Sequence, residues 1–234
     1  MIKEAEVRKE FDLGGIVPWG RRFDEYADFF ALADMPPEGP ILDVGGGPAS
    51  FAVEAARRGQ EVVACDPIYA ATGDAIRQRF EETRSDMMAG LRLAQYRFNW
   101  TRYGSPERIE KIRREALELF LADFEARGRV RYVPASLPVL PFADDAFQTA
   151  LCSHLLFLYG DDLDAAFHVA AVRELARVAR EVRIFPLVNL DGRPSSHLPV
   201  VMAELEAAGL FPELVRVPFE FQRGATEMLR IGKG

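Results

Sequence analysis

Short apolar runs alternate with longer amphipathic segments along most of this chain. The amphipathic segments repeat apolar side chains every three or four residues, which is the period of a helix that buries one face. The apolar runs fit strands that are buried on both sides. Strands are expected at 41–44, 62–64, 130–133, 149–157 and 182–188. Because helical segments separate most of these runs, the pattern predicts an α/β domain with a mostly parallel sheet.

Two further apolar runs, 214–221 and 227–231, follow a predicted helix at 196–208. The link between them runs through residues 222–224, and so short a link requires an antiparallel pair. The sheet is therefore expected to finish in an antiparallel hairpin. Other helices are expected at 21–34 and 162–178.

Residues 67–129 are longer than a connection between parallel strands needs, since one helix and a loop would be enough. Two helical stripes occupy this segment, with a break at 99–104. Ser105 and Pro106 are typical of the start of the second helix, and Gly128 is typical of its end. The segment leaves from the edge of the sheet where ligands bind. We therefore expect an inserted substrate cover or a dimer contact.

A glycine-rich turn follows the first strand, and an acid ends the second strand. Gly45, Gly46 and Gly47 let the backbone bend sharply and approach a ligand closely. Asp66 follows at a spacing suited to accepting both hydroxyls of a ribose. These features predict a nucleotide-like ligand, and dinucleotide and S-adenosylmethionine sites share them. A tight turn without a ligand is the alternative.

Two details distinguish these ligands. The turn has Pro48, and Ser50 replaces the third glycine of a pyrophosphate-binding motif. Asp43 would repel a pyrophosphate but could hold the ammonium of a methionine-like tail, directly or through water. The stretch ILDVGGGPASFA, residues 41–52, resembles the first motif of the class I S-adenosylmethionine-dependent methyltransferases.

Residues 140–147, Leu-Pro-Phe-Ala-Asp-Asp-Ala-Phe, resemble the loop after the third strand in many of these enzymes. The resemblance places Ser136 where the family usually has an acid that binds the adenine amino group. A hydroxyl can accept the same hydrogen bond, but it carries no charge. Leu137 would supply a backbone N–H to the ring, and Gln148 replaces a second family Asp.

These matches cover residues 40–66 and 130–232 and imply a Rossmann-like three-layer sandwich. Its sheet would have seven mostly parallel strands and an antiparallel C-terminal hairpin. The whole chain, 1–234, would be a single methyltransferase domain, with an N-terminal helical cap at 1–39 and the helical insertion at 67–129. The implied methyl donor is S-adenosyl-L-methionine, and the product is S-adenosyl-L-homocysteine.

Position makes several other residues candidates for the donor site. Pro67 follows Asp66 and can form an apolar wall for the adenine, or simply begin the next element. Trp19, Arg22 and Tyr26 precede the sheet and can close over the site, with Arg22 pairing with a carboxylate. Ordinary helix packing and a surface arginine are the alternative.

The end of the fourth strand, with Ser153 and His154, is expected to point at the reacting sulfur. Methyl transfer from a sulfonium chiefly needs alignment, and a base is needed only if the acceptor carries a proton. His154 is the histidine placed to act as that base, and a hydrogen bond within its own loop is the alternative. Residues 99–103 of the insertion are candidates for the acceptor pocket.

Composition narrows the class of protein further. The 234 residues carry a net charge of −7, which argues against broad nucleic-acid binding, although residues 77–131 hold more basic than acidic side chains.

The charged start, residues 1–12, lacks the apolar core of a signal peptide. No run approaches the roughly 20 apolar residues of a membrane helix. We therefore expect a cytoplasmic protein. Cys65 and Cys152 lie in apolar runs, and neither a disulfide nor a metal site is indicated.

The expected function is methyl transfer to a small molecule, because no separate domain for recognising RNA or protein is visible. Three alternatives stay open. An NAD(P)-dependent oxidoreductase would use the same glycine turn and Asp66. An S-adenosylmethionine-binding protein without transfer activity would keep the loop. An RNA methyltransferase would use the basic insertion, with a steep salt dependence of binding. A homodimer is also open.

Overall fold

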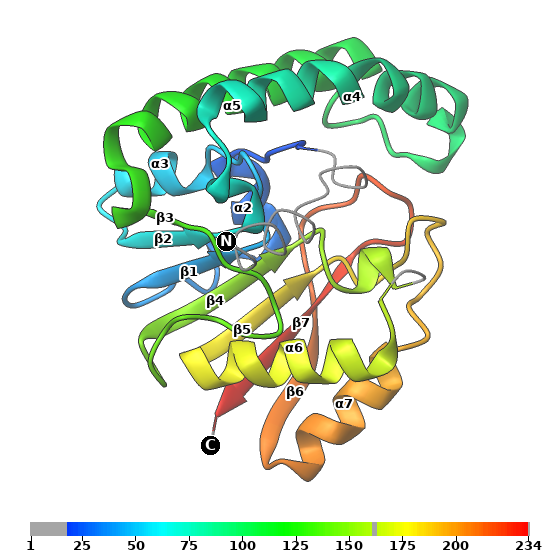
Figure 1. Cartoon of the computed structure of the whole chain (residues 1–234). Coiled ribbons are helices and arrows are strands. Elements are labelled where there is room, and N and C mark those ends of the chain that lie inside the picture. The colour runs from blue at the N-terminus through cyan, green and yellow to red at the C-terminus, as the bar shows by residue number, and fades with distance from the viewer. Residues whose placement is uncertain (1–17, 161–162, 234) are drawn as a thin grey trace, which may run out of the picture.

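A computed structural model describes residues 18–160 and 163–233 (Figure 1). Within them, one sheet has the strand order β3-β2-β1-β4-β5-β7-β6. Strand β7 runs antiparallel to β5 and β6, and the other neighbours are parallel. This confirms the predicted mostly parallel sheet with an antiparallel end. The strands are β1 (Ile41–Val44), β2 (Val62–Cys65), β3 (Tyr132–Val133), β4 (Phe147–Ser153), β5 (Ala179–Phe185), β6 (Leu210–Arg216) and β7 (Glu227–Lys233).

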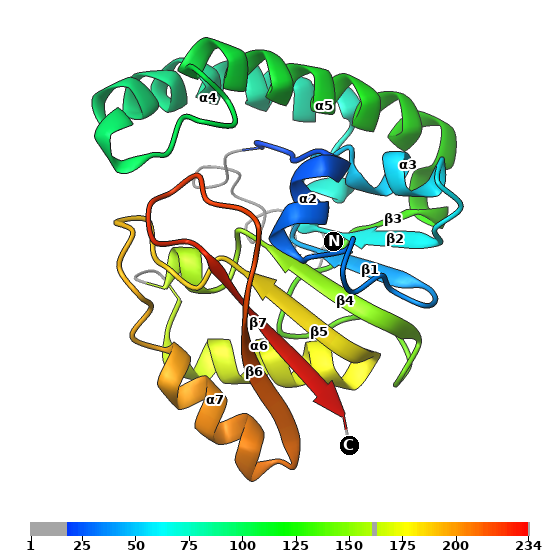
Figure 2. The ribbon, with the colours of Figure 1, turned by 180° about the vertical axis from the view of Figure 1, so that it is seen from behind.

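Helices cover both faces of the sheet. Helices α6 and α7 lie on one face, α2 and α3 lie on the other, and α4 and α5 run across the end of the molecule beyond α3 (Figures 1 and 2). Among the described helices, none is long and apolar enough to cross a membrane. The helices are α2 (Phe23–Phe29), α3 (Phe51–Ala56), α4 (Gly73–Leu93), α5 (Pro106–Arg127), α6 (Ala165–Val178) and α7 (Leu198–Ala207).

Strand β1 shows why the sheet is buried on both faces. Ile41 packs into the apolar cluster formed with α2, α3 and the insertion, whereas Leu42 and Val44 pack into the cluster formed with α6 and α7. Side chains alternate across a strand, so Asp43 is directed to the α2 face. The continuous apolar runs of the sequence are therefore the two-sided strands of a covered parallel sheet.

Several predicted boundaries differ from the structure: β3 is shorter than 130–133, β5 is shifted from 182–188, and β4 and β6 begin earlier than expected. Three further differences have a local reason. Helix α2 ends at Phe29 rather than at 34, because Ala31 has a φ of +48°. Strand β4 ends at Ser153, because His154 has a φ of +55° and leaves the sheet. Strand β6 ends at Arg216, before Pro218, which has no N–H to donate to a ladder. The connection to β7 is consequently much longer than residues 222–224.

The insertion consists of helices between β2 and β3, as predicted. Ser105 Oγ accepts a hydrogen bond from the backbone N–H of Arg108 at 3.3 Å, and Gly128 ends α5 with a φ of +48°. Many of its arginines pair with glutamates on the facing helix. These pairs are Arg77–Glu118, Arg84–Glu110, Arg92–Glu107 and Arg114–Glu81. Much of the basic excess of the insertion therefore belongs to an ion-paired helical surface.

Some expectations lie outside the described residues. They are the absence of a signal peptide in residues 1–12, the part of the 1–39 cap before residue 18, and a helix start at 162. Cys65 and Cys152 are buried, unpaired, small apolar side chains on the strands that flank β1 on either side.

Candidate functional site

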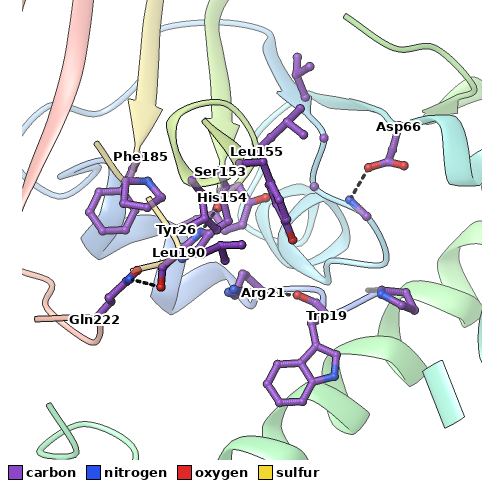
Figure 3. A pocket seen from close by; sticks show the side chains of 18 of the residues that line it. Trp19, Arg21, Tyr26, Asp66, Ser153, His154, Leu155, Phe185, Leu190 and Gln222 are labelled. Atoms are coloured by element: carbon purple, nitrogen blue, oxygen red, sulfur yellow. Dashed lines mark hydrogen bonds between the residues drawn. The ribbon is translucent and has the colours of Figure 1, made fainter. Parts of the chain in front are cut away.

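A cavity of about 650 Å³ lies at the carboxyl edge of the parallel strands (Figure 3). The loops after β1 to β5 form part of its wall. The segment before α2, both insertion helices and the β6–β7 loop form the rest. Ligands of open α/β sheets bind at this edge, outside the carboxyl ends of the strands. The cavity is also large enough for a small-molecule ligand.

Each glycine of the turn after β1 has a structural reason. Gly45 and Gly47 have φ values of +71° and +58°, in the region that favours glycine. A Cβ on Gly46 would lie 2.4 Å from Asp43 Oδ2 and 3.0 Å from the Tyr26 hydroxyl. The turn therefore brings bare backbone to the cavity surface, where a side chain would displace the buried groups beneath it.

Asp66 faces the cavity from the end of β2 and is fixed by backbone donors. The N–H of Gly47 donates to Oδ2 at 2.9 Å, and the N–H of Ile68 donates to Oδ1 at 2.8 Å. Burial raises the pKa of Asp66 to about 6, although these hydrogen bonds oppose the rise. Each oxygen keeps further acceptor capacity. The carboxylate can therefore accept two more hydroxyl donors, as a ribose requires.

Asp43 lies beneath the glycine turn and does not line the cavity. Its side chain is buried, and the Tyr26 hydroxyl donates to Oδ1 at 2.9 Å. Burial raises the pKa of Asp43 to about 7; the Tyr26 hydrogen bond opposes this rise, and the charge of Asp66 adds to it. A ligand ammonium above Gly46 would favour the ionised form. In this conformation the contact would run through a water molecule.

Pro67, Ser136, Leu137 and Ser153 line the same cavity as the glycine turn. They come from the loops after β2 and β3 and from the end of β4. The structure therefore brings together donor-site candidates from three separate stretches of sequence. Figure 3 shows Ser153 and Tyr26 on one side and Asp66 on the other.

His154 also lines the cavity, in a strained backbone conformation. Its ring lies 4.9 Å from that of Phe29 and 5.6 Å from that of Phe185, and Nδ1 is 2.8 Å from Ser153 Oγ. Burial, with the charges of Arg21 and Arg113, lowers the pKa of His154 well below its usual range. The imidazole is therefore neutral at pH 7. It can accept a hydrogen bond but is a weak base.

The structure corrects the choice of Arg22. Its guanidinium pairs with Asp24 at 3.6 Å and Glu115 at 3.4 Å, and it does not line the main cavity. The preceding residue, Arg21, does. A Cβ on Gly20 would lie 2.0 Å from the Pro48 carbonyl oxygen, so residues 18–22 lie directly on the glycine turn. This close packing directs Arg21 inward and Arg22 outward.

The structure has a buried ion pair next to the cavity that the sequence analysis did not predict. Arg113 of α5 donates from both terminal nitrogens to the two carboxylate oxygens of Glu25, each at 2.6 Å, and Tyr103 donates to the same carboxylate. Burial would raise the pKa of Glu25, but Arg113 lowers it to about 2. Arg113 lies four residues after Ile109, on the apolar stripe of α5. A cation on an otherwise apolar stripe is the signal in the sequence that could have indicated a buried ion pair.

Aromatic rings from the insertion and the β6–β7 loop line another part of the cavity. Phe98 stacks on Phe221 at 4.6 Å, and Tyr103 meets Phe221 edge to face at 4.9 Å. The N–H of Asn99 donates to the Phe221 carbonyl at 2.7 Å, which ties the insertion to the β6–β7 loop. Of the predicted stretch 99–103, Tyr103 lines the cavity.

Comparison with known proteins gives a limited picture. No protein-family model matches the chain. The sequence is 31% identical over 213 residues to the uncharacterized protein MJ0045 of Methanocaldococcus jannaschii, across 91% of this chain and 94% of that protein.

Among solved structures, the chain is similar to magnesium protoporphyrin IX methyltransferase from Synechocystis with bound S-adenosylmethionine. The TM-score is 0.44 and the identity 11%, over 91% of this chain and 78% of that one. It is also similar to a SAM-dependent methyltransferase from Aquifex aeolicus. There the TM-score is 0.43 and the identity 14%, over 97% and 95% of the two chains.

Proposed function

The chain belongs to the same family as the uncharacterized protein MJ0045 of Methanocaldococcus jannaschii, and we propose that it is an S-adenosylmethionine-dependent methyltransferase with a small-molecule acceptor. One observation carries the proposal. The turn formed by Gly45, Gly46 and Gly47 lies between two buried carboxylates, Asp43 and Asp66, at the ligand edge of the sheet. One acid suits an ammonium, and the other suits a ribose.

The residues present fit this donor. The site of Gly46 is a cradle that a Cβ would fill, and Asp66 has acceptor capacity left for two hydroxyls. Pro67 and Leu137 offer apolar surface for an adenine, and Ser136 offers a hydroxyl to its amino group. Acids at both ends of the turn favour a ligand with a positively charged tail over a pyrophosphate.

The chemistry needs little from the protein beyond placement. The bound donor supplies a methyl group on a sulfonium; the sulfur–carbon bond breaks as the acceptor atom forms its bond to carbon, and S-adenosylhomocysteine remains. The cavity walls hold the acceptor in line with that bond and exclude water. His154 accepts a hydrogen bond from an acceptor O–H or N–H and orients it. Because burial and the charges of Arg21 and Arg113 disfavour the protonated imidazole, His154 takes the proton only from an acceptor whose own negative charge offsets them.

The insertion supports a small acceptor rather than RNA. Helices α4 and α5 cover the cavity, and several of their arginines pair with glutamates across the two helices. Those cations are already neutralised, so they add little to a phosphate-binding surface.

Calorimetric titration with S-adenosylmethionine, S-adenosylhomocysteine and NAD⁺ tests the proposal. We expect micromolar binding of the first two compounds and none of NAD⁺. Asp66→Ala should weaken S-adenosylhomocysteine binding by about 1.5–3 kcal/mol, because the ribose hydrogen bonds to a charged group are lost. Preference for NAD⁺ would support the oxidoreductase alternative. If none of the three compounds binds, the methyltransferase proposal fails.

A further inference from the structure

The cavity continues beyond the donor residues into a space bounded by aromatic and aliphatic side chains. Phe98, Tyr103, Phe219 and Phe221 come from the insertion and the β6–β7 loop, and Phe185 comes from the end of β5. Figure 3 shows Phe185, Leu190 and Gln222 on the side of the cavity opposite Asp66. Aliphatic side chains of α4 and α5 complete the wall, namely Met87, Leu91 and Ile109.

These aromatic walls are held in place by packing and by backbone hydrogen bonds. Phe219 meets Phe29 at 4.5 Å, and Phe221 stacks on Phe98 at 4.6 Å. The N–H of Arg223 donates to the Arg97 carbonyl at 3.0 Å, a second backbone hydrogen bond between the β6–β7 loop and the insertion. A rigid set of ring faces and edges fits a planar, apolar molecule, because stacked and edge-to-face contacts both require flat partners.

One positive charge in the described lining of the cavity is not balanced by a carboxylate. Arg113 is neutralised by Glu25, whereas no carboxylate among the described residues lies within ion-pair distance of Arg21. Asp66 is the one acidic residue in the described lining, and it belongs to the glycine-turn side. Trp19 adds an indole N–H that has no acceptor among residues 18–160 and 163–233.

The backbone of Arg21 lies beside the glycine turn, where its carbonyl accepts a hydrogen bond from the Ser50 N–H at 3.0 Å, and its guanidinium, which donates to the Trp19 carbonyl, lines the cavity. Burial, together with the charge of Arg113, lowers the pKa of Arg21 to about 10, against the opposing effects of Glu25, Tyr103 and Tyr26. Arg21 stays protonated at pH 7 and has the donors of a carboxylate-binding residue.

We infer, resting on the proposed function, that the methyl acceptor is a planar, largely apolar molecule with one carboxylate, held with its ring against Phe98, Tyr103 and Phe221 and its anion at Arg21. The same cation could instead hold the carboxylate of the donor's methionine tail. The two sources differ in which ligand depends on Arg21, so binding measurements distinguish them.

The first measurement uses the unaltered protein saturated with S-adenosylhomocysteine. Calorimetry compares 2-naphthoate with 2-naphthamide, which has the same rings and no charge. We expect 2-naphthoate to bind about tenfold to a hundredfold more tightly, the usual range for a charge-assisted hydrogen bond in a buried site. Equal affinity, or no binding of either compound, overturns the inference. Failure of S-adenosylhomocysteine itself to bind would instead remove the proposed function.

The second measurement assigns the charge to Arg21. In Arg21→Gln the preference for 2-naphthoate should disappear, in Arg21→Lys part of it should return, and Arg22→Gln is the matched control with an outward cation. Affinity for S-adenosylhomocysteine should stay within about threefold in all three variants. If Arg21→Gln weakens S-adenosylhomocysteine but not 5′-methylthioadenosine, which has no carboxylate, Arg21 holds the donor tail and the inference is wrong.

Discussion

The glycine-turn half and the aromatic half of the cavity are built in opposite ways. The first is largely continuous in sequence: β1, the turn and the end of β2 lie within residues 41–67, and the loop after β3 and the end of β4 add Ser136, Leu137 and Ser153. The second brings together residues 18–26, 98–113, 185–190 and 219–225. Local backbone geometry determines the first half, and long-range packing determines the second. We therefore expect changes in one half to leave ligand binding in the other largely intact.

We expect the largest effect from removing the buried charge of Glu25. This effect should concern the aromatic half of the cavity. Glu25→Gln leaves Arg113 buried without a counter-ion, which should lower the free energy of unfolding by about 3–5 kcal/mol. Urea unfolding at pH 7 measures the loss. Glu115→Gln, at an exposed pair with Arg22, is the control and should change stability by less than about 1 kcal/mol.

This effect should depend on pH in a defined direction. The pKa of Glu25 is lowered to about 2 in the folded protein, against roughly 4.3 in an unfolded chain. Its stabilising contribution is therefore complete above about pH 4.5 and is lost as pH falls toward 2. The difference in free energy of unfolding between the parent protein and Glu25→Gln should therefore be smaller at pH 3 than at pH 7. Equal stability at pH 7 would contradict the assigned role of the pair.

Gly46→Ala should disrupt the glycine-turn half of the cavity. The added Cβ would meet Asp43 and Tyr26 beneath the turn, so the turn must move away from its ligand-binding position. We expect affinity for S-adenosylhomocysteine to fall by about a hundredfold, near 2.7 kcal/mol. Gly90→Ala is the control, because Gly90 is an exposed residue of α4 with no atom within 4 Å of an added Cβ. It should stabilise the protein slightly. Unchanged affinity in Gly46→Ala would reject the turn as the donor site.

Asp43→Asn should change stability and donor affinity in opposite directions at pH 8. The pKa of Asp43 is raised to about 7 in the folded protein, so its ionisation costs stability as pH rises from roughly 4 to 7. Asparagine keeps an acceptor for Tyr26 without the charge. Thermal unfolding should show a variant more stable than the parent by about 1–3 kcal/mol at pH 8 and similar to it at pH 4. Donor affinity should fall at pH 8. A variant that is less stable at pH 8 would contradict this account.

Phe221→Leu should have the smallest effect, confined to the aromatic half. The substitution removes a ring face and the stacking on Phe98 but keeps apolar surface. Affinity for 2-naphthoate should fall about threefold to tenfold. S-adenosylhomocysteine affinity should change by less than about twofold, and a comparable loss for both ligands would show that the two halves are coupled.

The sequence determined the backbone of the glycine-turn half. Gly45, Gly46 and Gly47 are required by backbone angles and by the close approach of Asp43, which are local effects. The apolar runs separated by helical segments predicted the parallel sheet. The two runs after the last helix predicted its antiparallel end, although the connection between them is longer than expected. Helix caps at Ser105 and Gly128 were also predictable, since a cap depends on a few neighbouring residues.

Tertiary structure decided the aromatic half and the choice between neighbouring arginines. Nothing local distinguishes Arg21 from Arg22; the packing of Gly20 against the glycine turn turns one inward and the other toward Glu115. The pairing of Glu25 with Arg113 joins helices 88 residues apart. Local sequence patterns carry information about turns and periodicity, whereas contacts of this range exist only after the sheet has brought α2, the insertion and the β6–β7 loop to one edge.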